Sequence, residues 1–176
     1  MTNSFVYNFM ELISSFGDHA LIVASVVLTF SAVFYFYSYK KEAFLVAAVL
    51  FSTLISEGLK LLFKLPRPDG AVYILNNPGD VYGFPSGHAM FYTVFFGFLI
   101  YLFVKLGKIS KFLRYPGILV SIVLIAFVGI SRVYLGVHYV HDVIGGYSFG
   151  LIVLFTLIFF HQNKGFSGLF NSKKES

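Results

Sequence analysis

The sequence predicts an all-α integral membrane protein, a helical bundle of about five transmembrane helices with one further helix in the membrane interface. Of its 176 residues, 57% are hydrophobic and 12% are charged, which is about half the charged fraction of a soluble domain. The apolar residues form runs of roughly 20, the length that crosses a bilayer as a helix. Such runs do not alternate with polar residues, so no β-strand pattern is present.

Five apolar runs define the expected membrane spans. Each is long enough, or nearly long enough, to cross the hydrocarbon core. The chain has the length of one domain, and we expect residues 1–176 to form a single unit. The runs cover residues 20–39, 42–63, 89–106, 115–133 and 140–160.

The two ends of the chain are expected to lie outside these spans. Residues 3–17 place Phe9 and Leu12 at helical spacing, with Glu11 on another face. This pattern predicts a short interfacial helix, although an N-terminal extension of the first span fits it equally well. Residues 164–176 are expected to form a cytoplasmic tail.

Composition excludes several kinds of site. The chain has no cysteine, so disulfides, thiolate nucleophiles and thiolate metal sites are absent. A net charge of +5 can indicate nucleic-acid binding, but here the basic residues lie in short loops and tails between apolar runs. We therefore expect no nucleic-acid partner, and the sequence indicates neither a cofactor nor an obligate protein partner.

The basic residues predict the orientation. With five spans, the turn at 40–41, the loop at 105–114 and the C-terminal tail share one side of the membrane. That side holds most of the 13 Lys and Arg residues, so the positive-inside rule places it in the cytoplasm. The other four Lys and Arg residues lie on the extracytoplasmic side, close to the polar clusters. Anion binding would explain why they depart from the positive-inside rule. They are Lys60, Lys64, Arg67 and Arg132.

The tetrapeptide Pro85-Ser86-Gly87-His88 predicts a helix start that can bind an anion. Ser86 is a strong N-cap residue. Unpaired N–H groups and the helix dipole favour phosphate at such a terminus, and Gly87 lets a ligand approach the backbone closely. An ordinary capped helix has the same residues, so this signal is weak by itself.

The pair His138 and Asp142 predicts a nucleophile. At i, i+4 spacing on a helix the carboxylate reaches one imidazole nitrogen. This fixes the tautomer and leaves the other nitrogen available for attack. A structural histidine is the alternative. His141 is expected to be structural or interfacial, because its neighbour Asp142 should point elsewhere.

Three cations could hold a phosphate. Lys60 and Arg67 are seven residues apart and share a face if their helix continues. The following prolines are expected to end it near Leu65, which would place Arg67 at the mouth of the site and Lys60 about two turns below; snorkelling to the interface is the alternative. Arg132 adds a second planar fork for phosphate oxygens. His88 could protonate the leaving oxygen. Glu57 is expected to neutralise Lys60 or Lys64 rather than to catalyse.

Zinc is the main chemical alternative. His88, His138, His141 and Asp142 could ligate it. However, three or more cations in the same cavity would repel a metal ion. The sequence therefore favours an anion site without metal.

Three motifs occur in order: Lys60-x6-Arg67-Pro68, then Pro85-Ser86-Gly87-His88, then Ser131-Arg132-x5-His138-x3-Asp142. Together they resemble the signature motifs of the type 2 phosphatidic acid phosphatase (PAP2) superfamily. Asp69 departs from the family pattern, which often has a further basic residue there. The resemblance implies a compact helical bundle and a metal-independent membrane phosphatase.

The resemblance also implies roles for individual residues. His138 would be the nucleophile and form a phosphohistidine, Asp142 would orient it, and His88 would protonate the leaving group. The residues implied to hold the phosphate are Lys60, Arg67, Ser86, Gly87 and Arg132.

The resemblance implies an envelope lipid as substrate and a bacterial inner membrane as location, with the active site facing the periplasm. Similar small members act on undecaprenyl diphosphate, phosphatidylglycerol phosphate or the 1-phosphate of lipid A. We expect residues 68–84 and grooves between helices to recognise the rest of the substrate. Alternatives are a lipid-to-lipid phosphotransferase, an anion-binding or transport protein, and a vanadium-dependent peroxidase, for which an apolar five-span chain is a poor scaffold.

Overall fold

The computed structural model describes residues 4–71 and 81–171, and it confirms the all-α class. Within these residues the regular elements are helices, and the β-type pairing is a single bridge between Pro66 and Tyr82. The helices are α1 (Ser4–Asp18), α2 (Ala20–Phe36), α3 (Lys40–Ala48), α4 (Phe51–Phe63), α6 (Gly87–Lys105), α7 (Lys111–Tyr134), α8 (Val140–Gln162) and α9 (Lys164–Asn171).

The helices match the expected number of membrane spans. Four are long and apolar enough to cross a membrane: α6, α7, α8, and α3 with α4 taken together as Lys40–Phe63. The pair α1 and α2 also qualifies, but its two helices are bent by 74°. Helix α1 is therefore not a straight extension of the first span. Its position in the membrane interface stays a prediction, as does the cytoplasmic position of the tail that contains α9.

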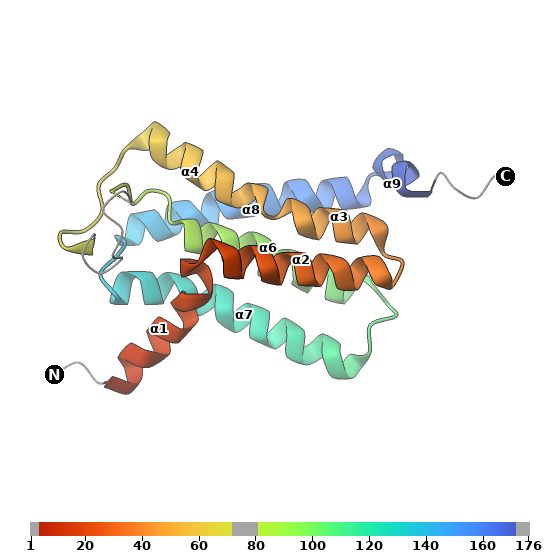
Figure 1. Ribbon diagram of the computed structural model, residues 1–176, viewed down its shortest axis with the longest axis horizontal. Coiled ribbons are helices and arrows are strands. Elements are labelled where there is room, and N and C mark those ends of the chain that lie inside the picture. Colours follow the sequence, from red (N-terminus) through yellow and green to blue (C-terminus); the bar gives the residue numbers. More distant parts are fainter. Residues whose placement is uncertain (1–3, 72–80, 172–176) are drawn as a thin grey trace.

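Helix α6 forms the centre of the bundle (Figure 1). Its sequence is apolar on every side, a pattern typical of a helix surrounded by others. In its most apolar stretch, α6 is 56% buried, whereas the corresponding stretches of the other three spans are 28–33% buried. The large side chains of Tyr92, Phe95 and Phe98 are fully buried. The other spans therefore face the lipid, while α6 packs mainly against α8 and α7.

Glycines on α8 allow it to approach α6 closely. A Cβ on Gly146 would lie 2.5 Å from the Ser86 carbonyl oxygen, and one on Gly150 would lie 3.0 Å from the Met90 carbonyl oxygen. Backbone therefore packs directly on backbone along this contact.

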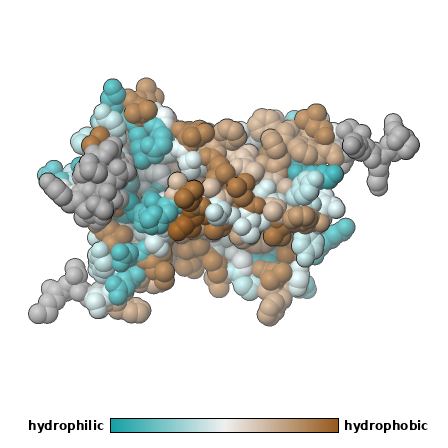
Figure 2. Space-filling model, viewed as in Figure 1, coloured by the Kyte–Doolittle hydropathy of each residue, from teal (hydrophilic) through white to brown (hydrophobic). Residues whose placement is uncertain are grey.

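Helix ends that carry polar motifs meet at one end of the bundle. The ends of α4 and α7 and the starts of α6 and α8 lie together on the left of Figure 1, and α9 lies at the opposite end. Figure 2 shows the face of the molecule seen in Figure 1, with hydrophobic side chains over the middle of the bundle and hydrophilic ones gathered toward its two ends. At the α9 end, the buried His161 imidazole bonds to Glu42 at 2.9 Å and to the Tyr101 hydroxyl at 2.8 Å.

Candidate active site

A cavity of about 1270 Å³ opens at the end of the bundle where the motifs meet. It brings together six of the eight predicted site residues, which come from α4, α6, α7 and two loops. The remaining two, Ser86 and Asp142, are fully buried behind its wall. The six that line the cavity are Lys60, Arg67, Gly87, His88, Arg132 and His138.

His138 and Asp142 form a buried hydrogen-bonded pair. The His138 Nδ1 atom lies 3.2 Å from Asp142 Oδ2, and the Tyr139 N–H donates to the same oxygen at 2.9 Å. The expectation that both residues lie on one helix is wrong, since α8 begins at Val140. His138 instead lies in the loop before the helix, and the carboxylate of the first turn reaches back to it.

The contact with Arg67 indicates which imidazole nitrogen carries the proton. The Arg67 Nη1 atom lies 2.9 Å from His138 Nε2. A guanidinium group has donors but no acceptor, so Nε2 must accept and the proton must lie on Nδ1, which donates to Asp142. Nε2 is thus the unprotonated nitrogen of the ring, as a nucleophile requires, and in this structure Arg67 occupies the position beside it.

The surroundings of His138 favour its neutral form. The residue is only 3% exposed, and burial lowers the pKa of its imidazole below the usual range, because a charged ring is poorly solvated there. The nearby charges of Arg67 and Arg132 act in the same direction, whereas Asp142 opposes them. A neutral imidazole is the form that can attack phosphorus.

His141 lies closer to this pair than the sequence suggested. Its Nε2 atom lies 3.1 Å from Asp142 Oδ1, and its side chain is 58% exposed. The expectation that Asp142 points away from His141 is wrong, since the two side chains meet in the first turn of α8. Asp142 is thus flanked by two imidazoles, one buried and one facing solvent.

Arg67 reaches the site from an extended segment. Helix α4 ends at Phe63, where Lys64 adopts the left-handed conformation, two residues before the expected end. The Arg67 N–H donates to the Val81 carbonyl at 3.3 Å, which aligns the two sides of the long loop. Arg67 Nη1 also donates to the Val137 carbonyl at 2.9 Å.

Lys60 lies one turn before the end of α4 and is 7% exposed. Its Nζ atom lies 2.8 Å from Glu57 Oε1. The expected neutralisation by Glu57 is confirmed, and the partner is Lys60 rather than Lys64. The exposed Lys64 has no place in the cavity wall.

Ser86 begins α6, as predicted. Its hydroxyl accepts from the Ala89 N–H at 3.5 Å. The Ser86 N–H in turn donates to the Asp142 carbonyl at 2.9 Å, so the second and third motifs are joined through the backbone. Gly87 and His88 follow at the cavity wall, where the helix terminus favours an anion.

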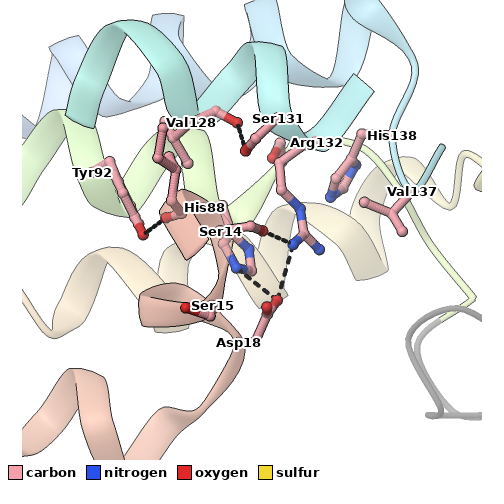
Figure 3. Close-up of polar contacts among 12 residues, drawn as sticks. Ser14, Ser15, Asp18, His88, Tyr92, Val128, Ser131, Arg132, Val137 and His138 are labelled. Carbon is pink, nitrogen blue, oxygen red and sulfur yellow. Dashed lines mark hydrogen bonds and ion pairs between the residues drawn. The ribbon is translucent and has the colours of Figure 1, made fainter. Parts of the chain in front are cut away.

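Asp18, which the sequence analysis did not select, joins His88 to Arg132 (Figure 3). Its Oδ1 atom lies 3.0 Å from His88 Nε2 and 2.9 Å from Arg132 Nη1. The Ser14 hydroxyl also accepts from Arg132 Nη1. One signal could have indicated Asp18: it is a charge next to the start of the first expected span, on the same side as the motifs.

The zinc alternative depends on how the histidines and carboxylates gather. Between residues 4–71 and 81–171, no three His, Asp or Glu side chains gather as metal ligands would. The residues considered for zinc are instead divided, since His88 pairs with Asp18 whereas His138 and His141 pair with Asp142. Of the loop at 68–84, residues 72–80 lie outside the described part.

Comparisons with known proteins identify the family of this chain. The model of the PAP2 superfamily matches residues 41–166. A phosphatidylglycerophosphatase B of Bacillus subtilis is 33% identical over 149 residues, which cover 83% of this chain and 70% of the relative. A lipid A 4'-phosphatase of Porphyromonas gingivalis is 33% identical over 144 residues, 75% of this chain but 57% of the relative.

A solved structure has the same fold. It is the crystal structure of a transmembrane PAP2-type phosphatidylglycerolphosphate phosphatase from Bacillus subtilis, with a TM-score of 0.77 and 26% identity. The match covers 92% of this chain and 79% of that one. By family match, identity and fold, this chain is a multi-pass membrane protein of the PAP2 superfamily and a phosphatase.

Proposed function

We propose that this phosphatase hydrolyses a phosphate ester of an envelope lipid through a phosphohistidine at His138, without a metal, on the extracytoplasmic face. The observation that carries the proposal is the bond between Arg67 Nη1 and His138 Nε2. It places a phosphate-binding guanidinium beside the lone pair that would attack. Phosphoryl transfer needs chiefly this combination of positioning and charge neutralisation.

In the first step, His138 Nε2 attacks phosphorus while the bond to the lipid oxygen breaks. The leaving oxygen keeps the bonding electron pair and takes a proton from His88. Asp142 stabilises the imidazole as it gains positive charge. Lys60, Arg67, Arg132 and the start of α6 at Gly87 hold the phosphate oxygens, and Ser86 supports that helix start as its N-cap.

In the second step, water attacks the phosphohistidine. His88, now neutral, takes a proton from the water, and the N–P bond breaks to release inorganic phosphate. His138 returns to the neutral form that its burial favours, so the site is ready for another lipid.

Phosphatidylglycerol phosphate is the substrate that the comparisons support first, because a relative of that specificity matches 70% of its own length. Undecaprenyl diphosphate and lipid A phosphate present the same terminal phosphate to the same cations. The cavity also has apolar lining residues, Val23, Ala24, Leu50 and Leu54, which suit the hydrocarbon part of a lipid.

Purified protein should release inorganic phosphate from at least one lipid of a panel without added metal. The panel contains phosphatidylglycerol phosphate, undecaprenyl diphosphate, phosphatidic acid and lipid A. We expect EDTA to leave the rate unchanged and vanadate to inhibit it, because vanadate resembles the phosphorus centre during transfer.

Other outcomes of this assay would contradict the proposal. A rate lost in EDTA and restored by zinc would identify a metal mechanism. Labelled phosphate that appears on an acceptor lipid instead of in solution would identify the phosphotransferase alternative. Anion flux that resists vanadate, without any phosphate release, would identify a transport protein.

The extracytoplasmic orientation gives a separate prediction. Tags at the N-terminus and in the loop at 105–114 should report opposite sides of the membrane, with the loop in the cytoplasm. The physical reason is the excess of Lys and Arg on the loop side. Accessibility of the two tags to an impermeant reagent in intact cells checks it, and a cytoplasmic N-terminus would refute the orientation.

A further inference from the structure

The last turn of α1 is anchored to the active site at several points. The Tyr92 hydroxyl donates to the Ile13 carbonyl at 2.6 Å, and Ser14 and Asp18 bond to Arg132. A Cβ on Gly17 would collide with the His88 ring, so the lack of a side chain there is what allows the helix to come so close. Asp18 thus reaches His88 from a turn that is anchored to α6 and α7.

We propose that Asp18 is a positioning residue of the active site, which favours the protonated form of His88 and orients Arg132. The inference rests on the proposed function, in which His88 gives a proton to the leaving lipid oxygen. Asp18 would do for the acid what Asp142 does for the nucleophile. Each imidazole of the site then has its own carboxylate.

The charges around His88 show why the acid needs this partner. The charged groups that face it are Asp18 from α1, Lys60 from α4 and Arg132 from α7, and the neutral Tyr92 ring stacks on it from α6 itself. The His88 side chain is 14% exposed. Burial and two cations disfavour a charged imidazole, whereas a carboxylate at 3.0 Å favours it. Asp18 is the one group of this set that stabilises the form able to donate a proton.

Arg132 can bind Asp18 and phosphate together. Asp18 and Ser14 both use its Nη1 atom. These contacts leave the rest of the guanidinium group unused by Asp18, and Arg132 lines the cavity, so it can still donate to a phosphate oxygen. In Figure 3, His138 lies on the other side of the guanidinium group from Asp18. Asp18 therefore fixes the arginine from the side away from the attacking nitrogen.

The proton requirement depends on the leaving group, and this dependence provides a test. As the Nε2–P bond forms, the electron pair of the broken P–O bond stays on the leaving oxygen. A lipid alcohol leaves as a strongly basic alkoxide unless His88 gives it a proton. A nitrophenolate is a stable anion that leaves without one.

The experiment compares kcat/KM of wild type and Asp18→Asn for a lipid phosphate monoester and for p-nitrophenyl phosphate, across pH. For the lipid we expect a loss of about 10²-fold, the size typical of a general acid, and a much smaller loss for the nitrophenyl ester. The basic limb of the lipid pH profile should move to lower pH by about one unit or more, because the cationic imidazole loses its carboxylate.

Two further variants complete the design. Asp18→Glu keeps the carboxylate, so the basic limb of its lipid pH profile should lie near that of the wild type. This variant keeps the test available even if Asp18→Asn does not fold. A basic limb shifted to lower pH in Asp18→Glu would overturn the inference. Asp69→Asn removes the same charge from an exposed residue that has no place in the cavity wall. Its pH profile should match that of the wild type.

Other results of the comparison would overturn the proposal. Equal losses on the two esters with an unmoved profile would show a purely structural role. A higher kcat/KM in Asp18→Asn would show that the carboxylate competes with phosphate for Arg132. Wild-type protein that releases phosphate from neither ester would refute the proposed function itself, a result distinct from the others.

Discussion

Replacing His138 by glutamine should reduce phosphate release by about 10⁴-fold or more, since the reaction loses the atom that attacks phosphorus. Glutamine offers Arg67 a carbonyl oxygen in place of Nε2, so the buried guanidinium keeps an acceptor. The cavity and its cations should therefore persist. The measurement is the initial rate of phosphate release from the preferred lipid.

A trapping experiment should identify the intermediate. Brief incubation with a labelled lipid followed by rapid denaturation should leave acid-labile phosphate on the wild-type protein and none on His138→Gln. His161→Gln is the matched control: it replaces another buried histidine, in the last turn of α8, and should retain both label and activity. Labelled His138→Gln would disprove the assignment of the nucleophile.

Replacing Asp142 by asparagine should lower kcat by about 10³–10⁴-fold, the scale seen when the carboxylate of a histidine pair becomes an amide. The carboxylate accepts from His138 Nδ1 and from the Tyr139 N–H. An amide oxygen in this place could still accept both bonds, but it carries no charge and would not stabilise the imidazole as it gains positive charge. An amide turned the other way would leave the proton on Nε2, which could then neither attack nor accept from Arg67.

Binding measurements should separate this effect from a loss of phosphate affinity. The cations of the cavity are unchanged in Asp142→Asn, so inhibition by vanadate should remain close to that of the wild type while turnover falls. Asp69→Asn provides the matched control, because Asp69 is exposed and has no place in the cavity wall. Near wild-type turnover in Asp142→Asn would contradict the role of Asp142 as the orienting group.

Sequence patterns predicted the parts of the fold that repeat a simple physical rule. The spans follow from apolar length, and the helix start at Ser86 follows from N-cap chemistry. The meeting of the polar clusters follows from the alternation of spans across the membrane. These rules depend on near neighbours in the sequence or on the count of crossings, so a single chain is enough to apply them.

Local geometry at the site could not be predicted in the same way. His138 lies before α8 rather than on it, and His141 turns toward Asp142, because the loop and first turn depend on tertiary packing. Asp18 was missed since its partner Arg132 is 114 residues away along the chain. No periodicity in the sequence connects Asp18 with Arg132. The position of the Asp18 carboxylate depends on the bend of 74° between α1 and α2.

The close packing of α6 and α8 has a consequence for how the site tolerates change. The two helices that carry His88 and Asp142 touch through backbone atoms at Gly146 and Gly150 and are joined by the bond from the Ser86 N–H to the Asp142 carbonyl. At these two glycines α8 contributes no side chain that could change rotamer. Thermal motion or sequence change at the lipid-facing surface therefore has little means of altering the distance between α6 and α8. The spacing between the helix that carries the acid and the helix that carries the orienting carboxylate is thus set by the thickness of two main chains, a quantity that does not vary with the lipid in which the protein resides.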